Sequence, residues 1–497
     1  MRNISPNFER FQTECQQADV VPVTVQLLAD QHTSVTLLQR FYHNREGVFL
    51  LESVEGGEKW GRYSFVGIEA HAFVEVHAET IRVRRFNDQG KPAAETVTPH
   101  HGKPLEHLRE LMAEYRSAEN SDLPRFFGGL VGYFAYEMVS FFEPVPHKLN
   151  DEPLASFVIP RTLLILDNAK QLLTVYVLTF PNKDANDPKT QYQTACNEIS
   201  RVIAELEKPF ASRQPEIEHE LELKSVFSEK EYRRRVEMIK QHIIDGDIIQ
   251  CVFSQPFVSE TAPDAISLYR ALRFTNPAPY LFFMHLGETV LVGSSPETMV
   301  RLEGKTATLR PIAGTRKRGR TEQFDRELAD EMLRDPKEKA EHLMLVDLGR
   351  NDLGRIARTG TVQVTDLMFI ERYSHVMHLV SNVTAELEEG YDGFDLLRAT
   401  FPAGTLSGAP KVRAMQIIAE QETSPRGPYG GAAGYISFGG NIDFAITIRS
   451  AQIRNGELKA QSGGGIVYDS KPELERMETV NKAMGITKAL ELLGKIS

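Results

Sequence analysis

The chain has 497 residues, of which 41% are hydrophobic and 25% are charged, and its formal net charge is −11. This composition is ordinary for a soluble globular protein, and the acidic balance argues against a general nucleic-acid-binding role. The three cysteines, Cys15, Cys196 and Cys251, are far apart and lack metal-ligand spacing, so we expect a reducing cytoplasm. Neither an apolar segment of the signal-peptide type nor a membrane-spanning run of about eighteen apolar residues is found in the sequence, so export by that route and a membrane location are not expected.

The first part of the chain mixes strand and helix patterns. Alternating apolar residues over 162–166 and 172–178, on either side of Asp167 and Asn168, predict a β-hairpin. Between residues 208 and 227 the sequence becomes polar and acidic and contains two prolines. We therefore predict a boundary there, with an N-terminal subdomain over 1–215 and a C-terminal region over 216–497.

A helix signal opens the second part. Ser228 and Glu231 have the spacing of a capping box, and apolar residues at helical spacing follow them up to Gly246. Further along, Asn455 and Gly456 predict a hairpin between 442–453 and 458–461.

Strand patterns dominate the remainder of this part. The expected strands are 248–257, 290–293, 299–302 and 306–310, the last two joined by a turn at Glu303 and Gly304. Strand clusters separated by helices, without regular strand and helix alternation, predict an α+β fold of two packed, largely antiparallel β-sheets with helices outside.

Several polar residues are candidates for chemistry. Glu297 follows Pro296 in an apolar strand setting, which raises a carboxyl pKa and suits a general acid. His375 and His378 flank two apolar residues, where a lone histidine is more often a satisfied core residue than a catalyst. Arg449 follows a strand and can grip a carboxylate with two parallel hydrogen bonds, although a salt bridge is the plainer interpretation. The short basic cluster over 316–320 is interpreted as a solvated loop.

Two pairs of glutamates lie in strongly helical segments, with three residues' spacing in each pair: Glu338 with Glu341 and Glu475 with Glu478. That spacing places both carboxylates of a pair on one helix face. Four carboxylates facing one cavity suit Mg²⁺, which prefers oxygen ligands and shares a negatively charged substrate. The plainer alternatives are a solvated helix face and a capping box between Glu338 and Asp335.

The local signals around these pairs predict where the two helices start and which side they bury. Asp335 is expected to cap the first helix, with apolar contact from three of its residues, and Pro472 is expected to open the second. The apolar residues of the first helix are Leu343, Leu345 and Val346, and the predicted buried stripe of the second is Leu474, Met477, Val480 and Met484.

Three glycine-rich segments come late in the chain, over 402–410, 429–435 and 462–467. None fits a P-loop or a dinucleotide fingerprint. Glycine allows backbone N–H groups to approach a carboxylate closely, so these segments suit a small organic acid. The alternative is that they are strand ends and turns.

Taken together, these segments resemble the chorismate-utilising enzymes, and among them the large subunits (component I) of anthranilate synthase. The resemblance covers nearly the whole chain and implies the fold of that family. The motifs that carry it are LLES at 50–53, EKWGRYSF at 58–65, NPAPY at 276–280, GSSPE at 293–297, RPIAGTRKRG at 310–319, KEKAEHLMLVDLGRNDLGR at 337–355, PAGTLSGAPK at 402–411 and ExxExxNK at 475–482.

The resemblance implies a lyase that converts chorismate and ammonia into anthranilate and pyruvate with Mg²⁺, in the first step of tryptophan biosynthesis. Glu297 is implied as the general acid and His378 as a residue beside the ring, with Thr405 as a further pocket residue. The implied metal ligands are Glu341 and Glu478, supported through water by Glu338 and Glu475. The implied substrate-binding residues are Gly314, Thr315, Gly463 and Gly465 near the ring carboxylate and Tyr429 and Arg449 at the enolpyruvyl carboxylate.

Two positions distinguish members of this family by their nucleophile. Relatives that add water use a lysine base where this chain has Gln250, and aminodeoxychorismate synthases use an attacking lysine where this chain has Ala313. Direct attack by ammonia is therefore the implied route.

The resemblance also implies two partners. Because no cysteine lies in a glutaminase elbow, ammonia from glutamine requires a separate glutamine amidotransferase small subunit (component II). L-tryptophan is implied as a feedback inhibitor at an allosteric site formed by Ser53, Pro279, Tyr280 and Tyr435. Two alternatives stay open, namely an aminodeoxychorismate synthase component I and a non-catalytic ligand-sensing subunit.

Overall fold

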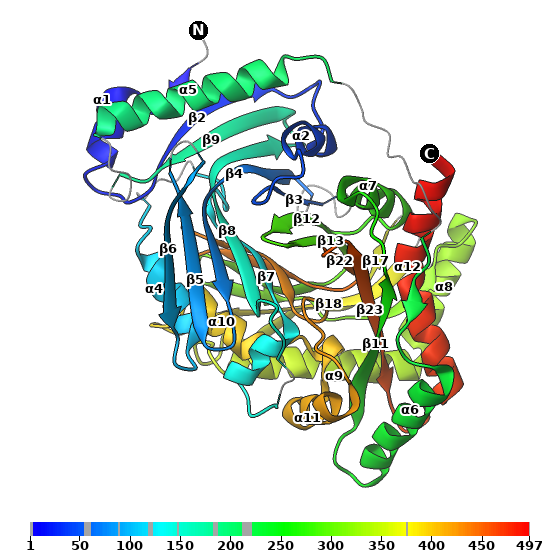
Figure 1. Ribbon diagram of the computed structural model, residues 1–497. Coiled ribbons are helices and arrows are strands. Elements are labelled where there is room, and N and C mark those ends of the chain that lie inside the picture. The colour runs from blue at the N-terminus through cyan, green and yellow to red at the C-terminus, as the bar shows by residue number, and fades with distance from the viewer. Residues whose placement is uncertain are drawn as a thin grey trace.

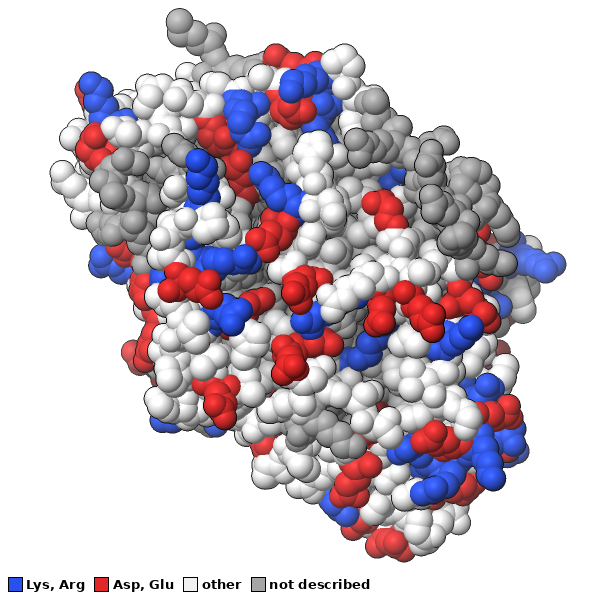
Figure 2. Space-filling view, viewed as in Figure 1, with Lys and Arg blue, Asp and Glu red and all other residues white. Residues whose placement is uncertain are grey.

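The computed structural model describes residues 3–53, 61–87, 90–117, 123–146, 149–181, 187–210, 221–373 and 376–496. Strands occupy the middle of the molecule and helices lie around them (Figure 1). None of the helices in these ranges is both long and apolar enough to cross a membrane. The face shown in Figure 2 has acidic and basic side chains interspersed, so charge on that face is not gathered into one patch.

The first part of the chain contributes nine of the described strands. They are β1 Ile4–Ser5, β2 Val21–Leu28, β3 Phe49–Glu52, β4 Tyr63–Val76, β5 Thr80–Phe86, β6 Pro92–Pro99, β7 Gly129–Phe134, β8 Ala155–Asp167 and β9 Leu172–Thr179. The helices of this part are α1 Phe8–Glu14, α2 Ser34–Phe41, η1 Tyr136–Phe141, α4 Pro104–Ala113 and α5 Pro188–Leu206.

The second part contributes the remaining described strands and the helices that carry most candidate site residues. Its strands are β10 Lys224–Ser225, β11 Gln250–Ser259, β12 Tyr280–Leu286, β13 Thr289–Ser295, β14 Thr298–Glu303, β15 Thr306–Leu309, β16 Ile312–Lys317, β17 Gln363–Arg372, β18 Val376–Glu386, β19 Gly408–Ala409, β20 Ala432–Ser437, β21 Ile442–Ile446, β22 Ser450–Arg454 and β23 Glu457–Ile466. Its helices are α6 Glu229–Ile244, α7 Ala265–Thr275, α8 Glu322–Arg334, α9 Pro336–Gly354, α10 Gly393–Thr400, η2 Gly404–Leu406, α11 Lys411–Gln421 and α12 Pro472–Ile496.

All pairings between the named strands are antiparallel, and they form two arms that meet at β4 and β8. One arm continues from β4 through β3, β12, β13, β22 and β23 to β11. The other continues from β8 through β7, β20, β21, β14 and β15 to β18. Met284 and Leu291 of the first arm and Val300 and Phe444 of the second belong to one buried cluster. The predicted α+β fold of two packed antiparallel sheets is therefore confirmed.

The two predicted subdomains share this framework. Their boundary at residues 215 and 216 lies outside the described ranges and stays a prediction. Strand β3 of the first part pairs with β12 of the second, and β7 pairs with β20. Side chains from both parts also fill the same core cluster, so packing holds the two parts together.

Local signals placed several elements correctly. The hairpin around Asp167 and Asn168 is formed by β8 and β9. Helix α6 begins after Ser228, whose side chain accepts a hydrogen bond from the backbone N–H of Glu231 at 3.2 Å. The strand predicted over 248–257 starts at Gln250. The turn predicted at Glu303 and Gly304 comes one residue later, after the last residue of β14.

The strand predicted over 442–453 is wrong in one respect, because it is interrupted between β21 and β22. Thr447, Ile448 and Arg449 separate the two strands, and Arg449 has a φ of 51°. This left-handed conformation is uncommon for a residue with a side chain and prevents a regular strand. The interruption moves β22 into the other arm, where it pairs with β13 and β23.

Candidate active site

The two glutamate pairs lie at the N-terminal ends of α9 and α12. Pro336 is the first residue of α9, and the Asp335 side chain caps that helix by accepting from the backbone N–H groups of Lys337 at 2.9 Å and Glu338 at 3.3 Å. Pro472 is the first residue of α12, as predicted. Asp335 and Pro336 fix the start of α9 and Pro472 that of α12, so the carboxylates fall within the first turns of both helices.

The charges of the two glutamate pairs act on one another. The pKa of Glu341 is raised first by loss of surrounding water and then by the charges of Glu338 and Glu478. Loss of water likewise raises the pKa of Glu475, and the charge of Glu478 raises it further. Repulsion of this kind brings the electrostatics of residues more than a hundred positions apart in the chain together.

Each glutamate pair also has a cation beside it. Arg316 Nη1 donates to Glu338 Oε1 at 2.8 Å, so the Glu338 side chain does not complete a capping box with Asp335. The interpretation of the basic cluster as a solvated loop is therefore wrong for Arg316, which belongs to β16. On α12, Lys482 Nζ lies 2.7 Å from Glu478 Oε1.

The buried side of α12 differs from the predicted stripe. Leu474, Met477 and Met484 are exposed, with Leu474 at 62%, and Val480 is half-buried. The buried residues are instead Thr479, Ala483, Ile486, Ala489, Leu490 and Leu493. The apolar residues predicted for α9 are mixed, since Leu345 and Val346 are buried but Leu343 is exposed. Helix α12 packs against α7 and β23, and its buried face combines small residues with Ile486, Leu490 and Leu493.

A magnesium ion suits this open arrangement of carboxylates. In the described part of the chain, no three His, Cys, Asp or Glu side chains converge tightly enough to enclose an ion by themselves. Mg²⁺ usually keeps several waters and takes one or two carboxylates together with substrate oxygens, so it does not need an enclosed protein cage. The oxygen-only donor set and the repulsion among the carboxylates fit that mode of binding.

Glycines in β23 let the candidate side chains lie against the backbone. A Cβ atom at Gly464 would lie 3.3 Å from Glu475 Oε2 and 3.5 Å from Glu478 Oε1. At Gly465 it would lie 2.3 Å from Gln250 Nε2, and at Gly463 it would lie 3.1 Å from the Tyr429 hydroxyl. This segment is thus a continuous strand paired with β11, and its lack of side chains creates the space in which these groups meet.

Arg449 lies beside α12 at the interruption between β21 and β22. Its Nη1 atom donates to the backbone carbonyl of Lys482 at 2.9 Å. Burial lowers the pKa of Arg449, while the neighbouring Tyr429 and Glu478 favour its charged form. A guanidinium held in this way presents its remaining N–H groups to an anion.

Glu297 is a buried carboxyl at the junction of β13 and β14. The Thr405 hydroxyl, on η2, donates to Glu297 Oε1 at 3.0 Å. Burial raises the pKa of Glu297 to about 7, against the smaller opposing effects of Thr405 and Lys482. The sequence-based expectation of an elevated pKa is met, and the group holds a proton at neutral pH in a large fraction of molecules.

His378 faces the turn that contains Gly314. Its Nδ1 atom lies 3.0 Å from the Thr315 hydroxyl and 3.2 Å from the Gly314 carbonyl. Gly314 has a φ of 61°, and a Cβ atom there would lie 2.9 Å from Glu338 Oε2, so the turn, the histidine and the first glutamate pair are close together. His378 is half-buried, and in the sheet it lies opposite Thr315 of β16. His375 lies outside the described residues.

Comparison with known proteins identifies the family to which this constellation belongs. Residues 58–488 match the family model described as chorismate binding enzyme. The chain belongs to this family. It is 43% identical to anthranilate synthase component 1 of Aquifex aeolicus over 99% of this chain and 98% of that protein. The component 1 protein of Cereibacter sphaeroides is also 43% identical, over 98% of each chain.

Solved structures of the family have the same fold. Anthranilate synthase component I from Streptococcus pneumoniae superimposes with a TM-score of 0.74 and 33% identity, over 93% of this chain and 99% of that one. The menaquinone-specific isochorismate synthase from Escherichia coli has a TM-score of 0.70 at 19% identity, over 97% and 98% of the two chains, which is a likeness of fold. Together with the full-length relatives, the match to the Streptococcus pneumoniae protein places this chorismate-binding enzyme among the anthranilate synthase component 1 proteins.

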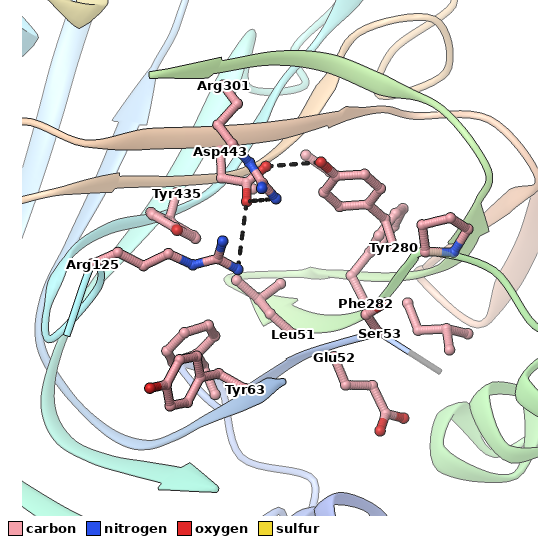
Figure 3. A pocket seen from close by; sticks show the side chains of 15 residues that line it. Leu51, Glu52, Ser53, Tyr63, Arg125, Tyr280, Phe282, Arg301, Tyr435 and Asp443 are labelled. Atoms are coloured by element: carbon pink, nitrogen blue, oxygen red, sulfur yellow. Dashed lines mark hydrogen bonds and ion pairs between the residues drawn. The ribbon is translucent and has the colours of Figure 1, made fainter. Parts of the chain in front are cut away.

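A second pocket of this chorismate-binding enzyme gathers all four residues expected at a regulatory site (Figure 3). Ser53 lines it from the end of β3, Pro279 and Tyr280 from the start of β12, and Tyr435 from β20. The Tyr280 hydroxyl donates to Asp443 Oδ1 at 2.9 Å. Arg301 and Arg125 reach the same carboxylate, at 2.6 Å and 3.9 Å. The pocket therefore has aromatic walls and a charged end, built from both parts of the chain.

Two residues of this enzyme's site had no role in the sequence-based reasoning. Lys482 donates to the Gly463 carbonyl at 2.9 Å and also pairs with Glu478. Its position four residues after Glu478 on a helix could have predicted that pairing. Arg426 is buried and donates to the carbonyls of Leu406 and Val252. Its role is invisible in the sequence because its partners lie on separate segments.

Proposed function

We propose that this enzyme converts chorismate and ammonia into anthranilate and pyruvate with Mg²⁺, the first step of tryptophan biosynthesis. The main support is that the charges of the α9 and α12 carboxylates act on one another, and that the α12 pair lies against Gly464 of β23. Full-length similarity to anthranilate synthase component 1 proteins supports the same reaction.

The proposed metal ligands are Glu341 and Glu478, with Glu338 and Glu475 acting through water. Bound there, Mg²⁺ supplies positive charge that orients and neutralises the ring carboxylate of chorismate. Backbone N–H groups at Gly314, Thr315 and Gly465 complete that carboxylate's environment. Gly314 lies close to Glu338 and Gly465 lies close to Gln250, which supports this assignment.

The enolpyruvyl carboxylate is assigned to Tyr429 and Arg449. Arg449 has one Nη atom engaged with the Lys482 carbonyl, which fixes its side chain without neutralising its charge. Charge-assisted hydrogen bonds of guanidinium to carboxylate are shorter and stronger than neutral ones. Tyr429 lies against Gly463, so both groups border the same stretch of β23.

Glu297 is assigned as the general acid of the first step. Addition of ammonia at C2 expels the C4 hydroxyl, a poor leaving group that departs as water when it receives a proton. With a pKa of about 7, Glu297 carries that proton at neutral pH, and Thr405 orients the carboxyl by donating to Oε1. His378 is assigned to the second step, the loss of pyruvate with aromatisation.

The nucleophile is assigned as ammonia itself. Gln250 is buried against Gly465 and has no basic group with which to activate water. Ala313, on β16 next to Gly314, offers no amine for covalent attack. Ammonia needs neither device because it is already nucleophilic.

The proposal also includes one partner subunit and one regulatory ligand. A glutamine amidotransferase subunit supplies ammonia, consistent with the component 1 names of the relatives. L-tryptophan occupies the pocket of Ser53, Pro279, Tyr280 and Tyr435, whose aromatic walls suit an indole and whose charged groups suit an amino acid.

The direct test is incubation of the purified protein with chorismate, Mg²⁺ and ammonium at mildly alkaline pH, with products separated and anthranilate followed by its fluorescence. Anthranilate and pyruvate in equal amounts are expected. Aminodeoxychorismate as the product would favour the aminodeoxychorismate synthase alternative. Binding of chorismate without any turnover would favour a ligand-sensing subunit.

A further inference from the structure

A cavity of about 50 Å³ lies on the side of Glu297 that is closed by α9 and by the segment around η2. Glu297 and Thr405 line this cavity, and Asp352 of α9 lines it as well. A water needs about 10–15 Å³ of such space, so a short row of waters fits inside. The walls between the carboxyl groups are mostly apolar, namely Met299, Leu309, Pro311, Leu345, Leu348 and Ile446.

The position of Asp352 separates it from the metal and substrate groups. Glu341, Leu345, Leu348 and Asp352 follow one another at spacings of four, three and four residues, so they share one face of α9. At 1.5 Å per residue, Asp352 lies roughly 16 Å beyond Glu341 along the helix axis. The face that carries the proposed metal ligand at its start thus carries a second carboxylate well past the ring-binding region.

Asp352 is held by a buried ion pair. Lys411 Nζ lies 3.0 Å from Asp352 Oδ2 and also donates to the Thr400 carbonyl at 3.0 Å. Among the residues that the structure describes, Asp352 Oδ1 accepts no hydrogen bond, so it is available to water. The Asp352 side chain is 7% exposed, a narrow contact with solvent. Burial raises the pKa of Asp352, while Lys411 opposes the rise.

The proposed function creates a need for such a group. When Glu297 gives its proton to the C4 hydroxyl, the C4–O bond breaks, water leaves and a buried carboxylate remains. One proton must then return to Glu297 in every turnover. Substrate and the proposed ligands occupy the reacting side, so the opposite side is the free approach.

We propose that the cavity is a water-filled proton-return route in which Asp352 is a proton-relay residue for Glu297. This inference rests on the proposed function and adds a role to a residue outside the substrate site. Asp352 takes a proton from solvent, passes it to the nearest cavity water, and each water passes one on until Glu297 regains its own. One proton enters through the relay per turnover, the nitrogen added at C2 releases one proton to solvent as it becomes a neutral amine, and no oxidation or reduction is involved.

The charges around the route are fixed. Glu297 faces Thr405 and the positive charge of Lys482. Asp352 faces Lys411, with Arg355 and Glu143 farther off. Arg310 also lines the cavity, but its Nη2 atom is engaged by Glu371 at 2.9 Å and its Nε atom by Asn382 at 3.1 Å. Glu297 and Asp352 are therefore the carboxyl groups placed to exchange protons with the cavity waters.

The test compares Asp352→Asn and the double variant Asp352→Asn with Lys411→Met against the unmodified enzyme, all with Mg²⁺ and ammonium. The double variant removes both charges and so avoids an unpaired buried ammonium. Asp347→Asn is the matched control, because that aspartate is on the same helix with 71% of its side chain exposed. The measurements are kcat, KM for chorismate, the solvent deuterium isotope effect on kcat, and the dependence of kcat on buffer concentration.

In both Asp352 variants, kcat is expected to fall by about a hundredfold, the lower end of the effect of a positioned proton-transfer group, with KM within about twofold of the control. The isotope effect should rise and high concentrations of a small buffer acid should restore part of kcat. An unchanged kcat, or a loss without any change in isotope effect or buffer response, overturns the relay while leaving the proposed function intact. Absence of anthranilate with the unmodified enzyme overturns both.

Discussion

Lys482 Nζ lies 2.7 Å from Glu478 Oε1, one turn farther along α12. A proposed metal ligand therefore has a protein cation as its neighbour before any metal arrives. Both side chains keep substantial exposure, at 37% and 48%, and such pairs contribute little to folding. Loss of the Glu478 charge should accordingly affect metal binding much more than stability.

The first prediction concerns the metal. Glu341→Gln and Glu478→Gln should each lower kcat by about a hundredfold or more at any attainable Mg²⁺, since each removes one charged ligand of a shared site. Turnover is followed by anthranilate fluorescence and folding by circular dichroism. Glu473→Gln is the control, because that residue is on the same helix, 55% of its side chain is exposed and it pairs with Arg233. Near-normal turnover in either ligand variant would exclude these metal roles.

The second prediction concerns the buried carboxyl of Glu297. Its pKa is raised from 4.5 to about 7, so the neutral form stabilises the fold fully below pH 4.5, and that contribution is lost as pH rises towards and through 7. The shift corresponds to about 3 kcal/mol. Glu297→Gln stays neutral and can still accept from Thr405, so its stability relative to the unmodified chain should increase by about that amount between pH 4.5 and 8. Urea unfolding of both proteins at several pH values measures the difference, and parallel pH curves would contradict the assignment.

The third prediction concerns the nucleophile. Gln250→Lys places an amine over Gly465, where Gln250 Nε2 now lies, and should yield a minor product from addition of water. Gln250→Met is the matched control of similar length and should form anthranilate alone. Chromatography of the products separates the two outcomes. If Gln250→Lys also forms anthranilate alone, a base at this position is insufficient for water addition.

The fourth prediction concerns regulation. Ser53→Phe should fill the pocket of Figure 3 and give an active enzyme that tryptophan no longer inhibits, whereas Ser53→Ala should remain sensitive. The adjacent Glu52 accepts from Ser34 at 2.5 Å and from Arg273 at 2.8 Å, which links the pocket to α2 and α7. If tryptophan weakens chorismate binding by some factor, linkage requires chorismate to weaken tryptophan binding by the same factor. Calorimetry that finds tryptophan binding indifferent to chorismate would remove the feedback proposal and leave catalysis untouched.

The fifth prediction concerns the buried Arg426. Its guanidinium pairs with Glu422 at 2.7 Å and donates to the backbone carbonyls of Leu406 and Val252. Arg426→Met leaves a buried carboxylate without its partner and should lower the free energy of unfolding by about 3–5 kcal/mol. Arg413→Met, which removes a half-exposed pair with Asp247, should cost below about 1 kcal/mol. Similar losses in the two variants would contradict a special role for Arg426.

Much of the local architecture follows from the sequence. Asp335 and Pro336 determine the start of α9, and Ser228 determines the start of α6, because capping depends on residues a few positions apart. That the two glutamates of each pair share one helix face also follows from helix geometry alone. These features could be predicted without knowledge of any contact between distant segments.

Other features depend on which segments meet in space. The exposed Leu474 and Met477 show that apolar spacing alone did not identify the buried face of α12, because the surface against which it packs favours Thr479 and Ala483. Arg316 was expected in solvent but binds Glu338, and the strand predicted through Arg449 is broken by its φ of 51°. Such outcomes arise from long-range packing and electrostatics, whose partners are not neighbours in the chain.

The sequence by itself therefore determined the type of fold, the starts of its helices and the helical spacing of the carboxylates, since each depends on periodicity and local hydrogen bonds. The tertiary structure decided that the charges of the α9 and α12 carboxylates act on one another, that glycines of β23 leave room beside the α12 pair, and that Glu297 is buried enough to keep a proton near neutral pH. Burial and the distances between charges are properties of the packed chain, and they set the pKa values and the cation-binding geometry on which the proposed chemistry depends.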